Sequence, residues 1–121
     1  MLRMSRDDFE QAVAQALDGI PEDLGQLIHN VAVVVEEEPT EEELWEVGLD
    51  PETDTLFGLY QGVALPERDS GYGGVAPDRI VIYRQPLLEA CRSRRELLRE
   101  IRNTVIHEVG HYFGLPEDAL P

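Results

Sequence analysis

Three residues near the end of the chain have types and a spacing that suit metal chemistry. His107, Glu108 and His111 form the pattern His-Glu-x-x-His. Residues four apart lie one above the other on a helix, so two imidazoles with this spacing can reach one metal ion. The residue after the first histidine projects beside that ion, where its carboxylate can take a proton from a metal-bound water. The pattern therefore predicts metal-assisted hydrolysis with Glu108 as the general base.

Chance on a polar helix face is the alternative explanation of the pattern. With three His and 16 Glu in the chain, it arises by chance in roughly one such sequence in a hundred, and Gly114 makes it about ten times rarer. The surrounding helix also has its own apolar stripe, which does not include the two histidines. We therefore expect the histidines to face a cleft and the stripe to face the core; its members are Leu98, Ile101, Val105, Val109 and Tyr112.

A catalytic zinc ion needs a third protein ligand and keeps water in its fourth position. Gly114 can adopt the positive φ of a sharp turn after the helix. The extended pattern with this glycine places the third ligand at position 117. That position is Glu117, whose carboxylate is an acceptable zinc ligand. Asp118 is the alternative ligand, and a solvated acidic segment is the alternative to both.

Hydrophobic spacing and capping residues predict the elements that must position this motif. We expect helices over 6–18, 21–28 and 41–47, and a helical stretch from Pro86 that breaks near Ser93 and continues to Phe113. We expect strands over 30–36, 55–65 and 79–83, the first buried on both faces and the second weakened or bulged at Gly58 and Gly62. This order predicts one α+β domain over residues 1–121, a small three-stranded sheet packed by helices, with the motif on a long C-terminal helix.

Composition bounds the class of protein. The single cysteine, Cys91, excludes a disulfide framework and is expected to be a small buried hydrophobe. A net charge of −15 argues against a nucleic-acid partner. No apolar run approaches the ~20 residues of a membrane span, and residues 1–11 lack the apolar region of a signal peptide. We therefore expect a soluble, cytoplasmic monomer with neither a nucleic-acid nor a membrane partner.

The acidity is concentrated in the first half of the chain. Residues 1–60 contain 16 acids and two arginines, whereas residues 61–121 contain nine acids and eight arginines. Seven of the acids fall within 36–46, where a solvated helix face is the usual explanation. Docking of an Arg-rich partner or mimicry of nucleic acid is the alternative. We expect the apolar residues of this acidic segment to anchor it to the core; these are Leu44, Trp45 and Val47.

The segment HEVGHYFGLPED, residues 107–118, resembles the active-site signature of zincin metallopeptidases with a metzincin-type glycine turn. The rest of the chain is similar to small bacterial zincin-like metallopeptidases at 21–24, 31–35, 56–60 and 79–87. The resemblance implies a minimal zincin-like fold, Zn²⁺ as cofactor and a peptide or protein substrate. It implies His107, His111 and the acidic residue at 117 as zinc ligands and Glu108 as general base. By the same analogy, strand 79–83 would pair with an extended substrate.

The chain also departs from the pattern of typical metzincins. Their last ligand is His, whereas position 117 is Glu here, and small relatives tend to have Asp. The only methionines are Met1 and Met4, so no methionine turn can follow the motif. Two functions therefore stay open, namely a zinc-dependent peptide hydrolase and a catalytically weak zinc-binding module that acts in regulation or interaction.

Overall fold

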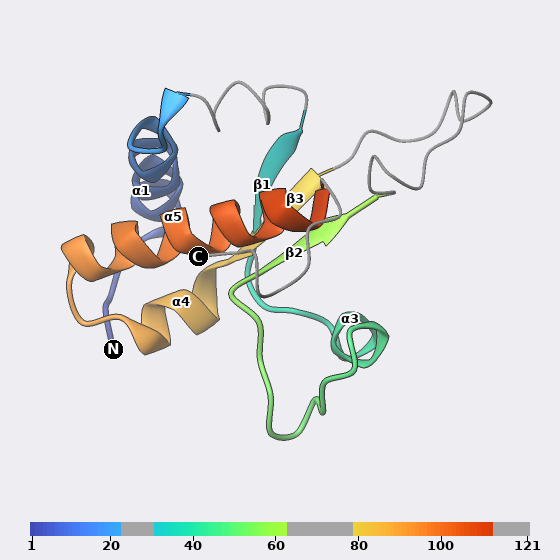
Figure 1. Cartoon of the computed structure of the whole chain (residues 1–121). Helices are drawn as coiled ribbons and strands as arrows, with labels where there is room; N and C mark the ends of the chain where they lie inside the picture. Colours follow the sequence, from blue (N-terminus) through green and yellow to red (C-terminus); the bar gives the residue numbers. More distant parts are fainter. Residues whose placement is uncertain (23–30, 63–78, 113–121) are drawn as a thin grey trace, which may run out of the picture.

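The computed structural model describes residues 1–22, 31–62 and 79–112, with side chains up to Gly110. The predicted helix over 21–28 and the helix end at Phe113 lie largely outside these residues. The described elements confirm an α+β fold and follow the predicted order (Figure 1): α1 (Arg6–Asp18), β1 (Ala32–Glu36), α3 (Glu41–Glu46), β2 (Gly58–Gln61), β3 (Arg79–Tyr83), α4 (Arg84–Ala90) and α5 (Arg94–Tyr112).

Side-chain caps fix where the helices begin. The Ser5 hydroxyl accepts a hydrogen bond from the Asp8 amide (3.1 Å) at the start of α1. At α3, the Thr40 hydroxyl accepts from the Glu43 amide (3.0 Å) while the Glu43 carboxylate accepts from the Thr40 amide (2.9 Å), a complete capping box. The Ser93 hydroxyl accepts from the Glu96 amide (3.1 Å), so α5 begins at the predicted break.

The sheet is mixed and has the order β1-β3-β2, with β3 in the centre. Strand β3 is parallel to β1 and antiparallel to β2. Its residues Ile80 to Tyr83 are fully buried, because neighbours cover both of its edges and elements pack on both of its faces. The central strand of this small sheet is therefore the third along the chain, which hydrophobicity alone did not specify.

Two strand predictions were wrong in detail. Strand β1 is not buried on both faces, because it lies at a sheet edge: Val33 and Val35 pack against the core cluster, whereas Ala32 is exposed. Strand β2 covers only 58–61, because the chain before it forms a loop, and the predicted residues 63–65 lie outside the described ranges. Gly58 begins β2 instead of forming a bulge in it.

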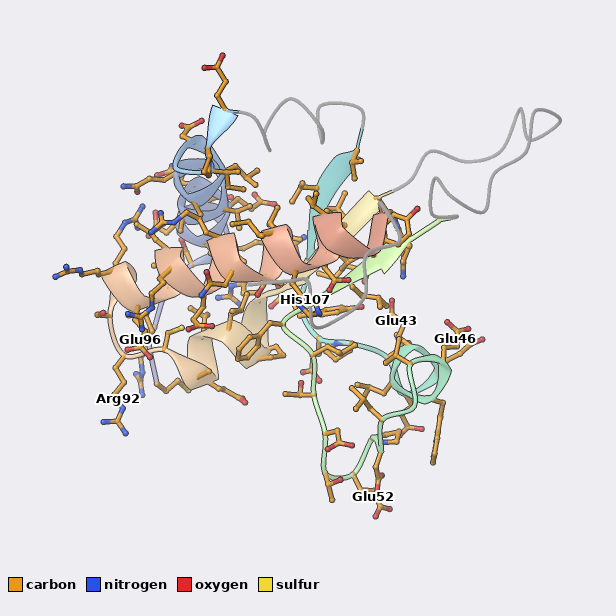
Figure 2. All side chains as sticks on the ribbon, viewed as in Figure 1. Glu43, Glu46, Glu52, Arg92, Glu96 and His107 are labelled. Carbon is orange, nitrogen blue, oxygen red and sulfur yellow. The ribbon has the colours of Figure 1, made fainter. Side chains whose placement is uncertain are left out.

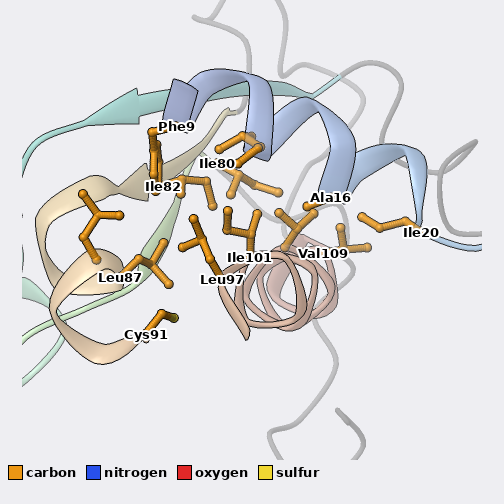
Figure 3. Packing of buried hydrophobic residues seen from close by; sticks show 14 of the residues in the cluster. Phe9, Ala16, Ile20, Ile80, Ile82, Leu87, Cys91, Leu97, Ile101 and Val109 are labelled. Carbon is orange, nitrogen blue, oxygen red and sulfur yellow. The ribbon is translucent and has the colours of Figure 1, made fainter. Parts of the chain in front are cut away.

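The core lies between α1, the sheet and α5 (Figure 3). The predicted stripe of α5 is confirmed at Ile101, Val105 and Val109, which are at most 5% exposed. It packs against the buried face of α1, and Cys91 is fully buried as expected. No helix in the part of the chain that the structure describes combines the length and hydrophobicity of a membrane span.

Candidate active site

The carboxylate of Glu108 is buried and held by the sheet. Glu108 is 5% exposed, and its Oε1 accepts a hydrogen bond from the backbone N–H of Tyr60 at 2.6 Å. The two residues are 48 positions apart in the chain. A hydrogen bond to a charged acceptor is about twice as strong as one between neutral groups. The contact therefore fixes the Glu108 side chain relative to β2.

A glycine allows α5 and β2 to approach this closely. A Cβ atom at Gly58 would lie 2.5 Å from Thr104 Cγ2 and 2.9 Å from the Val81 carbonyl oxygen. Both distances are far below the ~3.5–4.0 Å of ordinary contact. Gly58 is thus the residue that lets the edge strand rest on the helix and bring the Tyr60 amide to Glu108.

His107 lies on the same helix, half-buried and outside the apolar stripe. Figure 2 shows it on the side of α5 that faces the segment between α3 and β2. His111 lies one helical turn later on α5, which places its backbone above His107; its side chain, Glu117 and Asp118 lie outside the described residues. Within those residues no three His, Cys, Asp or Glu side chains form a group that could hold a metal ion.

The donor types nevertheless fit zinc. Two imidazoles from positions four apart on a regular helix and one carboxylate are an accepted set of ligands for a catalytic zinc ion. Glu108 follows His107 directly on α5 and is buried, and a carboxylate can serve as the general base beside a catalytic metal. The ligand roles of His107, His111 and Glu117 stay predictions, since the structure describes the side chain of only the first.

His107 and Glu108 line a pocket of about 490 Å³. One wall comes from α5 and the other from the segment between α3 and the middle of β2. The described residues that line it are Val47, Leu49, Leu56, Phe57, Gly58, Leu59, Asn103, Thr104, His107 and Glu108. The candidate catalytic residues therefore lie at one side of a largely apolar pocket.

The chain reverses after α3 to form the outer wall of this pocket. Gly48 has a φ of 81°, and its N–H donates to the Trp45 carbonyl (3.0 Å), while the Leu49 N–H donates to the Leu44 carbonyl (2.9 Å). These two bonds make a Schellman motif, in which the residue with positive φ is usually glycine. The motif directs the chain from the end of α3 into the pocket wall.

Local hydrogen bonds also give the rest of the wall a defined shape. The Asp50 side chain accepts from the Glu52 amide (2.9 Å), and the Asp54 side chain accepts from the Asp50 amide (2.8 Å). The Asp54 amide donates back to the Asp50 carbonyl (2.7 Å). Aspartate favours turns of this kind, so local hydrogen bonds set the conformation of the loop 50–54, which joins the Schellman motif to the part of the wall that pairs with β3.

Polar contacts tie α3 to the sheet. The Gln61 side chain donates to Glu43 (2.8 Å) and accepts from Arg79 (2.6 Å), which links α3, β2 and β3. Burial, with the Glu43 carboxylate adding to it, raises the pKa of the Tyr83 hydroxyl beyond its usual range. The two Gln61 hydrogen bonds therefore connect α3 to β2 and β3.

The expected apolar anchoring of α3 was wrong for two of its three residues. Leu44 is buried, but Trp45 is 64% exposed and Val47 is 43% exposed. A helix of only six residues turns one side chain toward the sheet, and the next positions point elsewhere. Val47 instead lines the pocket.

The expected pairing of substrate with strand 79–83 was also wrong. That strand is β3, and both of its edges already pair with β1 and β2. Strand β2 is the sheet edge beside α5 in the described part of the chain. The Tyr60 N–H points away from β3, toward Glu108, whereas the Tyr83 N–H bonds to the Phe57 carbonyl (2.9 Å). The two sheet edges in the described residues are therefore β1 and β2, and β2 is the one that lies beside α5 and Glu108.

Comparison with known families assigns the chain to one of them. The model of the zincin-like metallopeptidase family matches residues 28–121. The chain belongs to the zincin-like metallopeptidase family. The match covers β1 to α5, and so all the described elements that form the pocket of this zincin-like chain. At family level it supports a zinc-dependent metallopeptidase. A search of the curated proteins gave no match for this zincin-like chain.

Sequence reasoning missed two parts of this zincin-like site. It did not identify Tyr60, whose backbone amide holds Glu108, because a backbone donor leaves no trace in residue type. It also did not identify the pocket wall at Val47, Leu49 and Leu56. Gly48 directly after a short capped helix was the available signal for the Schellman motif that forms this wall.

Proposed function

We propose that the chain is a zinc-dependent peptide hydrolase in which Glu108 is the general base. His107, His111 and Glu117 are the proposed zinc ligands. The observation that carries the proposal is the Glu108 carboxylate, buried at the side of the pocket and held by the Tyr60 N–H at 2.6 Å. A bound zinc ion would lower the pKa of its water toward ~7 and polarise the peptide carbonyl.

The protein's own part in the reaction is to hold and move a proton. Oε1 of Glu108 receives the Tyr60 N–H, which limits rotation of the side chain. The carboxylate held in this way accepts the proton of the attacking water and can return it to the leaving amine. Removing a general base costs ~10²–10⁴ in rate, so Glu108 is where a substitution should cost most without removing metal.

Strand addition at β2 is the proposed mode of substrate binding. An extended peptide can add to a sheet edge through main-chain hydrogen bonds. Alternation along an antiparallel strand turns Gly58 to the same side as Tyr60, away from β3. A bound peptide would then run past Glu108, and protection of the Gly58 amide from hydrogen exchange on peptide binding would test this step.

Metal analysis followed by peptide-library cleavage tests the proposed activity. We expect one zinc ion per chain, cleavage that a chelator stops and added zinc restores, and loss of both zinc and cleavage in His107→Ala. Zinc binding without chelator-sensitive cleavage across broad libraries would contradict the hydrolase. That result would favour a zinc-binding module that acts in regulation or interaction.

A further inference from the structure

The pocket beside Glu108 has two chemically different walls. The segment before and within β2 supplies aliphatic and aromatic side chains, among them Val47, Leu49 and Phe57. The α5 wall supplies all of its polar side chains, which are Asn103, Thr104, His107 and Glu108. A volume of about 490 Å³ lies within the ~300–1,000 Å³ of small-ligand sites. The apolar wall thus offers space for a large apolar group next to the proposed reacting atoms.

The same part of the chain is strongly acidic. Residues 31–62 contain ten acids and neither lysine nor arginine. Glu46 and Glu52 lie on α3 and on the loop after it, with solvent-facing side chains (Figure 2). A surface with one sign of charge raises the local concentration of the opposite charge. The side of the pocket formed by 31–62 is therefore favourable to cationic and unfavourable to anionic peptides.

We propose that this pocket binds a large apolar side chain of a peptide whose neighbouring residues are basic. The proposal rests on the proposed function for its substrate class, a peptide, and on continuity of the pocket with Glu108 for its place. The Schellman motif at Gly48 and the pairing of β2 with β3 hold the apolar wall in place before a ligand binds. Less conformational entropy is then lost when a ligand binds, which favours affinity.

Binding of short labelled peptides to the full chain with Glu108→Gln tests the proposal without turnover. The probes are labelled octapeptides with a central Phe or Ala, flanked by either Arg or Glu residues. Their binding is measured by fluorescence anisotropy. A ligand with one more methylene group in a hydrophobic pocket is favoured by ~10–200-fold over the ligand that lacks it. We therefore expect the Phe–Arg peptide to bind at least about tenfold more tightly than the Ala–Arg peptide. We also expect its advantage over the Phe–Glu peptide to shrink as salt rises.

Two substitutions on the same helix separate pocket filling from a general effect on α5. Asn103→Trp, at an exposed position that lines the pocket, should abolish the preference for Phe. Arg99→Trp is the matched control, because Arg99 lies one turn earlier, is 64% exposed and does not line the pocket. Val47→Ser is a second pocket variant at an exposed position, and it should reduce the preference for Phe. It provides the test if Asn103→Trp does not fold.

The outcomes distinguish this proposal from the proposed function. Equal affinity for the Phe–Arg and Ala–Arg peptides overturns the apolar pocket, even if the wild-type chain cleaves peptides. Equal affinity for the Phe–Arg and Phe–Glu peptides at low salt overturns the charge preference. Selective Phe–Arg binding that Asn103→Trp removes supports the pocket, even if the wild-type chain cleaves nothing.

Discussion

Replacing Gly58 by Ala should separate the edge strand from the helix that carries Glu108. The added Cβ would lie 2.5 Å from Thr104 Cγ2 and 2.9 Å from the Val81 oxygen. The contact with Thr104 is about 1 Å or more shorter than an ordinary van der Waals contact, so β2 or α5 must shift. Overpacking of this kind costs about 1–3 kcal/mol, which would lower a urea midpoint by about 1 M at a typical slope.

Thr104→Ser gives a matched test of the cause. Serine removes Cγ2 but keeps the hydroxyl, which donates to the Glu100 carbonyl at 2.8 Å in the native chain. Urea unfolding of the two single variants and the double variant forms a double-mutant cycle. The loss of unfolding free energy in the double variant should be about 1 kcal/mol smaller than the sum of the losses in the two single variants. Recovery should be partial, because the contact with Val81 remains.

Two results would contradict the close contact between Gly58 and α5. Additive effects of Gly58→Ala and Thr104→Ser would show that the two residues do not meet. A Gly58→Ala chain with unchanged stability would show that β2 does not rest on α5 at this distance. The Tyr60 amide resonance offers a second readout, since loss of its 2.6 Å bond to Glu108 should move that resonance in Gly58→Ala.

Three further predictions concern the elements around the site. Gly48→Ala should cost about 1–2 kcal/mol in urea unfolding through its positive φ alone, because no atom lies within 4 Å of the added Cβ; a neutral effect would contradict the Schellman motif. Thr40→Ala should cost ~1 kcal/mol by removing the cap on the Glu43 amide, whereas Thr40→Ser should not. Burial raises the pKa of Cys91 above 9.0, so the folded chain keeps that proton longer than the unfolded chain and the free energy of unfolding falls as pH rises past about 9. Cys91→Ala should reduce this fall between pH 8 and 10, and equal slopes would refute the buried thiol.

Local signals predicted the elements better than their arrangement. The strand 79–83 and the start of the first helix after Ser5 were predicted correctly, because β-branched runs and capping residues act over a few positions. The burial of β1 was predicted wrongly, because its place at the sheet edge depends on pairing with Arg79–Tyr83, more than 40 residues away in the chain. Exposure of Trp45 likewise depends on how a short helix is turned against the sheet.

The site shows the same division. The pattern of His107, Glu108 and His111 is local in sequence, so it could be identified without a structure. The Tyr60 amide and the pocket wall at Leu49 could not, because they join α5 only through the fold. Substrate pairing was assigned to the wrong strand for this reason, since hydrophobicity marks the strand 79–83 as the strongest but does not tell that it is central.

The most direct test of the account is the rate of peptide hydrolysis by Glu108→Gln relative to the wild-type chain at equal zinc content. Glutamine keeps an oxygen that can accept the Tyr60 N–H, but it cannot accept the proton of water. We predict a rate lower by ~10²–10⁴-fold with zinc retained. Equal rates in the two chains would contradict the assignment of Glu108 as the general base.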